Sequence, residues 1–333
     1  MPTISRRSLL TGAAMNAAML SGAEDHPGRS VLAAARMILE AAPASIERAT
    51  GRAPLIAVTH HLAAAHASLE DLARRGDPSV RATAHALTVH CQLSTADALF
   101  GLGAVVRACQ ALRIVRERAD AIDDAARRDD LLHTALRIEG KIYTYGSSGG
   151  PVPPALAACD PTRARTPAQV AVAFQAARLG AREWSPARLQ AYVGYALDAA
   201  DRLPAAGAPG VYVDRFSFTN ALYHAQVAWA TGGVVPLAEQ YYPEIAAGMA
   251  GHHAGIAVVE FTMARMYFRL GRLADGIDHV RRGQQADPGH LASQRARIGA
   301  RNAAFRHRAD PYLRGLFPAP PPRPITALGS GTR

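Results

Sequence analysis

Apolar residues recur along most of this chain at intervals of three or four positions, the spacing that places them on one face of an α-helix. The pattern is first clear in a run of five residues: Val31, Leu32, Ala35, Ile38 and Leu39. It predicts a helix that begins near Ser30. A second helix is expected over roughly 55–75, after a break at 51–54 that contains glycine and proline.

The sequence also predicts where three further helices begin. At Asp77-Pro78, Thr166-Pro167 and Ser185-Pro186, a polar N-cap residue precedes a proline, which is tolerated at the first helical position because its missing N–H is not needed there. Gln169 completes a possible capping box with Thr166. The longest clusters of helix breakers, at 145–154 and 204–210, are expected to be loops.

The stretch from Met263 to Pro288 has the order of small, aromatic and turn residues that a stacked helical hairpin requires. Ala264 is small enough for two helices to touch, Tyr267 can fill the groove between them, Gly271 suits the turn, and Gly276 is the small residue of the second helix. Pro288 stands where such a unit of 34 residues ends. The stretch resembles a tetratricopeptide repeat.

The same offsets recur upstream, which matters because a single unit cannot bury its own apolar face. The clearest copy is Ala96, Leu99, Gly103 and Ala108; a weaker copy is Ala225, Ala228, Gly232 and Leu237; the weakest is Ala173, Ala176, Gly180 and Ser185, whose serine also reads as a helix start. The alternative is coincidence in a helical protein rich in alanine. We predict an all-α fold, a tetratricopeptide-like α-α superhelix over 30–315. The loop near 146–154 divides it into halves, a leader and linker occupy 1–29, and a disordered tail rich in proline and glycine occupies 316–333.

Composition agrees with close helix packing, since 49% of residues are hydrophobic but only 6% are aromatic. The formal net charge is +10, and Lys141 is the one lysine among 37 basic residues. The C-terminal third is rich in arginine. A solvated helical face explains this better than a nucleic-acid patch, because no stacking aromatics accompany the arginines.

The N-terminal residues bear on whether the protein is exported or stays in the cytoplasm. Residues 5–23 combine Arg6-Arg7, a weakly apolar segment and small residues, which is the order of a twin-arginine export signal. Asn16 within the apolar segment favours a pseudo-signal in a cytoplasmic protein, with export as the alternative. The three cysteines, Cys91, Cys109 and Cys159, indicate neither a disulfide framework nor a zinc site. No apolar run is long enough for a transmembrane helix.

Candidate chemistry is sparse. Among the histidines of residues 60–91, only His66, with Glu70, has the i, i+4 spacing that turns two ligands to one side of a helix. Solvated or core-edge side chains explain these histidines better than a metal site does. The glycines of 146–150 lack the lysine of a phosphate-binding loop. We predict no catalytic residue, no cofactor and no metal, and an enzyme is less expected than a binding protein.

Aromatic residues gather before and along the helix expected around 220. Phe216, Asn220 and Tyr223 are the candidate partner-binding residues, because an amide can pair with a peptide backbone through both donor and acceptor. The spacing of Phe216, Tyr223 and Trp229 nonetheless favours a buried helical stripe over residues that line a binding groove.

The run from Asp214 to Trp229 and the stretch 264–297 resemble the C-terminal sensor half of actinobacterial regulators that join an Xre-type helix-turn-helix domain to tetratricopeptide-like repeats. Arg6 to Leu10 matches the pseudo-signal often found between the two parts of those regulators. The sequence begins at that segment, so direct DNA binding is not expected. The resemblance implies a regulatory protein that binds a peptide or protein partner, with an exported protein or a tailoring enzyme on a repeat scaffold as alternatives. The oligomeric state stays open.

Overall fold

Helices account for nearly all of the chain that the structure, a computed structural model, describes: residues 27–47, 49, 52–146, 152–203, 218–248, 253–286 and 311. Within these ranges there is no β-strand, so the all-α class is confirmed. The leader as far as residue 26, the loop at 204–210, Phe216, Pro288 and the tail lie outside them, whereas residues 27–29 of the predicted linker belong to a helix. None of the helices described is both long and apolar enough to cross a lipid bilayer.

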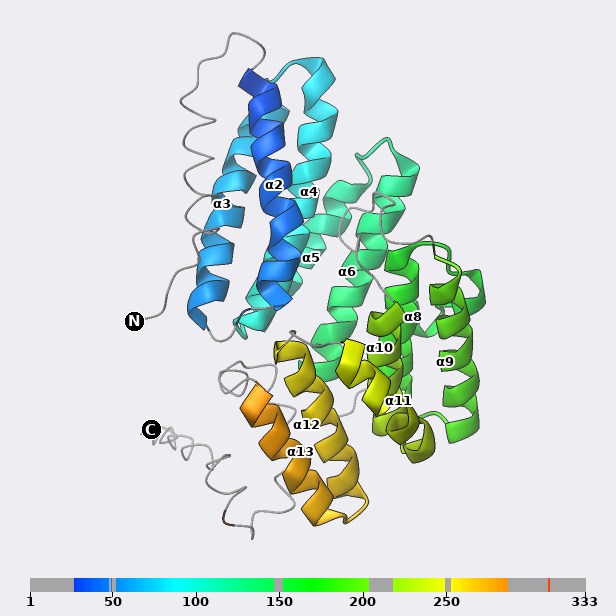
Figure 1. Cartoon of the computed structure of the whole chain (residues 1–333). Coiled ribbons are helices and arrows are strands. Elements are labelled where there is room, and N and C mark those ends of the chain that lie inside the picture. The colour runs from blue at the N-terminus through cyan, green and yellow to red at the C-terminus, as the bar shows by residue number, and fades with distance from the viewer. Residues whose placement is uncertain are drawn as a thin grey trace, which may run out of the picture.

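The helices follow one another along a curved path, from the α2–α4 group at the top of Figure 1 through α6 to α12 and α13 at the bottom. Their bounds are α2 Pro27–Glu47, α3 Arg52–Arg75, α4 Pro78–Gly101, α5 Val105–Ala119, α6 Ala125–Gly146, α7 Pro154–Ala157, the 3-10 helix η1 Pro161–Arg163, α8 Pro167–Gly180, α9 Pro186–Asp201, α10 Phe218–Gly232, α11 Val235–Gly248, α12 His253–Arg269 and α13 Leu273–Ala286.

The predicted helix starts are confirmed. Asp77 accepts a hydrogen bond from the backbone N–H of Ser79, Thr166 and Gln169 form the reciprocal capping box, and Ser185 accepts from the N–H of Arg188. Two other starts come earlier than expected, α2 at 27 and α3 at 52. Each of these helices has a proline in its first turn, where a missing N–H removes no intrahelical bond.

The helices form two layers. Even-numbered helices pack side by side in the order α2, α4, α6, α8, α10 and α12, and the odd-numbered helices α3, α5, α9, α11 and α13 pack against them. Between α6 and α8 the chain has only the short α7 and η1, so these two even-numbered helices follow each other without a long helix between them. We call the even-numbered set the inner layer and the odd-numbered set the outer layer.

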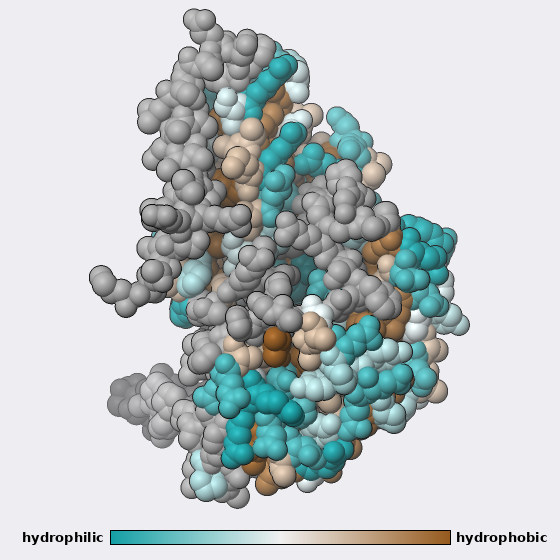
Figure 2. Space-filling model, in the orientation of Figure 1, coloured by the Kyte–Doolittle hydropathy of each residue, from teal (hydrophilic) through white to brown (hydrophobic). Residues whose placement is uncertain are grey.

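Burial differs between the layers. In α8 of the inner layer every residue from 170 to 180 is buried, which is expected of a helix enclosed by others. In α9 of the outer layer the buried residues form one stripe: Leu189, Val193, Ala196, Ala199 and Ala200. Figure 2 shows the result on one face of the molecule, where polar residues cover much of the lower hairpins and apolar residues appear in strips between helices.

Three of the turns between the layers have the same geometry. Gly103, Gly233 and Gly271 have φ angles of 79°, 77° and 73°, in the left-handed region that glycine adopts without strain. In each turn the N–H of the next residue donates to the carbonyl four residues before the glycine, over 2.9 Å. These donor and acceptor pairs are Ala104 to Leu99, Val234 to Trp229 and Arg272 to Tyr267. This is the Schellman end of a helix.

The expected register of the third copy is wrong by one residue. Gly232 is still helical and Gly233 makes the turn, so Trp229 corresponds to Tyr267 and Gln226 to Ala264. A Gly-Gly pair gives no local signal for which glycine turns. The fourth copy is not a turn of this kind, because Gly180 is the last residue of α8 and Ser185 caps α9.

Candidate binding site

The predicted repeat residues lie in the hairpins α4–α5 and α12–α13. Ala96, Ala108 and Ala264 are buried, and Tyr267 is 6% exposed. A Cβ added to Gly276 would come within 2.3 Å of the Phe268 ring, so a small residue is required there.

Asn220 and Tyr223, two of the three predicted partner-binding residues, lie on α10 and are both half-buried. Trp229, one face of the proposed aromatic stripe, is buried against Tyr241. The Tyr223 ring contacts His224, with ring centroids 5.0 Å apart. Tyr223 therefore lies next to a group of charged residues that the sequence analysis did not identify.

That group, the basic cluster, consists of Asp97, Arg137, Lys141, Arg178 and His224, which come from α4, α6, α8 and α10 of the inner layer. Lys141 Nζ lies 3.1 Å from Asp97 Oδ2, and a terminal nitrogen of Arg137 lies 3.8 Å from the same oxygen. A terminal nitrogen of Arg178 lies 3.3 Å from His224 Nδ1. Four consecutive inner helices thus bring their charges to one place.

The basic cluster is largely buried. The side chain of Asp97 is 3% exposed and Arg178 is 4% exposed. The side chains of Arg137 and Lys141 are 11% and 12% exposed, and His224 is partly buried.

Electrostatics keeps His224 neutral. Burial is the main cause that places its pKa well below the usual value, and the positive charges of Arg178, Arg137 and Lys141 lower it further, in that order. A neutral imidazole can accept a hydrogen bond from Arg178 through Nδ1.

The basic cluster was not predicted from the sequence, because most of its residues are far apart along the chain. Arg137 and Lys141 are one helical turn apart on α6, a local signal that the sequence does contain. Asp97, Arg178 and His224 are brought to them by packing between helices, which no spacing along the chain records.

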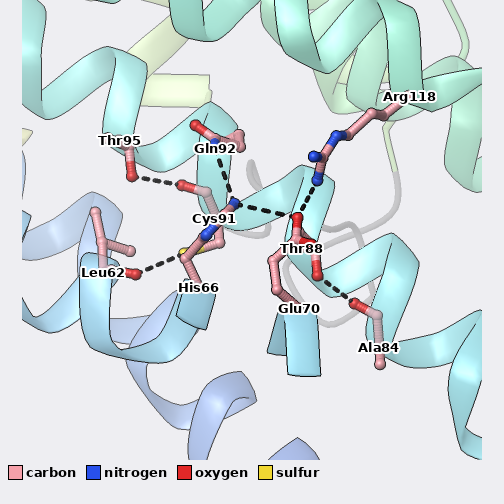
Figure 3. Close-up of polar contacts among 9 residues, drawn as sticks. All are labelled: Leu62, His66, Glu70, Ala84, Thr88, Cys91, Gln92, Thr95 and Arg118. Atoms are coloured by element: carbon pink, nitrogen blue, oxygen red, sulfur yellow. Dashed lines mark hydrogen bonds and ion pairs between the residues drawn. The ribbon is translucent and has the colours of Figure 1, made fainter. Parts of the chain in front are cut away.

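The His66–Glu70 pair belongs to a different polar group, which Figure 3 shows between α3, α4 and α5. The Gln92 amide nitrogen lies 2.9 Å from His66 Nε2, and Glu70 forms an ion pair with Arg118. Burial lowers the pKa of His66, which suits a neutral ring accepting from Gln92. This group joins three helices. No set of three or more potential metal ligands is found among the residues described.

A third polar group joins α11, α12 and α13 around Glu260, a carboxylate that is 3% exposed. His279 Nδ1 lies 2.7 Å from it, Arg282 Nε lies 3.4 Å from it, and the Tyr242 hydroxyl donates to it. Tyr267 stacks on the His279 ring. The carboxylate is therefore satisfied by side chains from both neighbouring helices, as a buried charge requires.

Comparison with known proteins adds no assignment: no family model, no curated protein and no solved structure matches this chain.

Proposed function

We propose that this chain is a tetratricopeptide-like helical-repeat protein that binds a peptide or protein partner, without catalysis, in a regulatory role in the cytoplasm. The observation that carries the proposal is the shared turn of the hairpins α4–α5, α10–α11 and α12–α13. Three such turns at equivalent positions, together with the two helical layers, are what a stack of similar units would produce. Scaffolds of stacked helices mostly present extended binding surfaces.

The surface beside Asn220 and Tyr223 is the best candidate for the partner. Both side chains are half-buried on an inner helix, so they are held in place but keep part of their surface accessible. An aromatic ring and an amide in such a position suit a peptide, because the ring supplies contact area and the amide pairs with the backbone. A role in regulation rests on the resemblance to the sensor half of Xre-type regulators and does not include direct DNA binding.

Substitution of Asn220 tests the proposal. Asn220→Ala should weaken co-purification of the partner from native cells, with a loss of about 5- to 30-fold in affinity, as for an interface residue worth about 1–2 kcal/mol. The melting temperature should change little. Gln190→Ala is the matched control, since Gln190 is an exposed amide on the outer helix α9. Equal recovery of the partner with both variants would contradict the proposed site, and tight, sequence-selective binding of duplex DNA would contradict the proposed function.

A further inference from the structure

The first helix of the array has fewer neighbours than the inner helices that follow it. Among the helices described, α4 packs against α2, α3, α5 and α6, whereas α2 packs chiefly against α3 and α4. Figure 1 shows α2 and α3 side by side at this end. Within the part of the chain that the structure describes, no outer helix precedes α2. An end unit of a stack exposes the face that the next unit covers elsewhere.

α2 has an apolar stripe on that face. Ala34 is half-buried, and Met37 and Ala41 are exposed, at the i, i+3 and i+7 positions of one side of the helix. Met37 is 54% exposed. Arg36 lies on the opposite side of α2, towards α6, where burial and then the charge of Arg36 lower the pKa of Arg127.

α3 continues the same face. Ala57, His61 and Ala64 are exposed at i, i+4 and i+7. They lie opposite His66 and Glu70, which bond with residues of α4 and α5, so they are on the side of α3 that borders α2. We call the exposed surface of both helices the end face: Ala34, Met37, Ala41, Ala57, His61 and Ala64.

Residues 8–20 have a sequence pattern that fits the end face. Leu9, Ala13, Ala17 and Leu20 recur at intervals of four, four and three residues, which would place them on one side of a helix. The two central alanines would let that helix lie close to the alanines of the end face. Residues 21–26 can extend over about 20 Å, which is enough to reverse the chain direction before α2 begins.

The same arrangement brings opposite charges together. In a helix antiparallel to α2, Arg7 would lie about 20 Å along the axis from Leu20, level with Glu40, which is the same distance from Pro27. Glu40 is exposed and lies next to Met37 at i+3. It forms no ion pair with any residue that the structure describes.

We propose that residues 8–20 form a helix that packs on the end face, antiparallel to α2, with Arg7 paired to Glu40. The occupant of the end face is then the leader of the same chain. It caps the array and withdraws Arg6 and Arg7 from any receptor that reads a twin-arginine signal. This inference is independent of partner binding at Asn220.

Hydrogen exchange of the full chain, followed by mass spectrometry of peptides from 8–20, tests the docking. A helix this short is marginal in water, so protection of its amides reports packing. We expect exchange about tenfold or more slower than in an unstructured chain, and Met37→Glu should return it to the unstructured rate. Val106→Glu is the matched control, because Val106 is a 72% exposed apolar residue on α5, outside the end face.

A charge exchange tests the predicted register. Arg7→Glu and Glu40→Arg should each reduce the protection of 8–20 by about two- to fivefold, as for an exposed ion pair, and the double variant should restore it. A double variant no better protected than either single variant would overturn the pairing of Arg7 with Glu40.

The docking itself has three contrary outcomes. Amides of 8–20 that exchange at the unstructured rate in the natural chain would overturn it. Protection that survives both Met37→Glu and Ala64→Glu would also overturn it, because these variants place a charge on each helix of the end face. Protection that increases with protein concentration would overturn docking within one chain and assign the end face to the leader of a second copy.

Discussion

Tyr267 shows how one side chain can join three elements. Its ring stacks on His279 of α13 with centroids 5.1 Å apart, and its hydroxyl donates to Glu239 of α11 over 2.8 Å. We expect Tyr267→Ala to lower the free energy of unfolding by roughly 3–5 kcal/mol, as for a buried aromatic residue cut back to alanine. Tyr267→Phe keeps the stacking and should cost about 0.5–1.5 kcal/mol. Urea unfolding measures both, and an alanine variant as stable as the phenylalanine variant would contradict this packing.

His90 makes the stability of the fold depend on pH. Burial, and to a lesser extent the charge of Arg127, lowers the pKa of His90 to about 3. Below about pH 6.5, His90 binds a proton in the unfolded chain but stays neutral in the folded chain. The free energy of unfolding should therefore fall with decreasing pH by about 1.4 kcal/mol per pH unit, down to about pH 3.

Replacing this histidine isolates its effect from those of other titrating groups. The unfolding free energy of His90→Gln, measured between pH 6 and pH 4, should fall less steeply than that of the natural chain by up to about 1.4 kcal/mol per pH unit. Parallel curves for the two proteins would show that His90 does not titrate in this way.

At the scale of single residues, the sequence predicted features that depend on neighbouring positions but not contacts between residues far apart in the chain. Asp77, Thr166 and Ser185 cap helices as predicted, because an N-cap depends on the next three residues of the same segment. The basic cluster could not be predicted in the same way. Arg178 and His224 meet only because α8 packs against α10.

The helical hairpin α12–α13 depends on two glycines for different reasons. Gly271 has a φ of 73°, so Gly271→Ala should cost about 1–2 kcal/mol of backbone strain. Gly276 lies against the Phe268 ring, and Gly276→Ala should cost about 1–3 kcal/mol by overpacking.

A second substitution in the same hairpin separates the two mechanisms. Trimming the ring with Phe268→Leu should reduce the cost of Gly276→Ala and leave the cost of Gly271→Ala unchanged, as a double-mutant cycle of unfolding free energies would show. Equal coupling of both glycines to Phe268 would contradict the distinction.

The same element scale explains the error in the third hairpin. A fixed offset identified Gly232, but its added Cβ would lie 2.3 Å from Leu189 of α9, so this glycine serves helix packing while Gly233 turns the chain. The sequence contains both glycines. Only the neighbouring helix distinguishes their roles.

For the whole molecule, the helical class followed from composition and periodicity, since both are summed over many residues. The arrangement of the helices in two layers could not be predicted from the sequence in the same way. The breakers before Pro154 predicted a loop, but not that α7 and η1 would stand where the other inner helices are separated by a long outer helix. Leu156 of α7 is fully buried beside Val172 and Ala176 of α8. The four residues of α7 therefore cover part of α8 at the place where other inner helices are covered by a long outer helix.

The two layers also determine how the fold should come apart. Each inner helix contacts the next one in line, so we expect partial opening to begin at an end of the array. In native-state hydrogen exchange, amides of α13 should become exposed at a lower free energy than those of α8, which has helices on every side. Identical opening energies for both would mean one all-or-none unit. With graded opening, α13 could detach while the basic cluster on α4, α6, α8 and α10 stays assembled, so the end of the array could open without disturbing its middle.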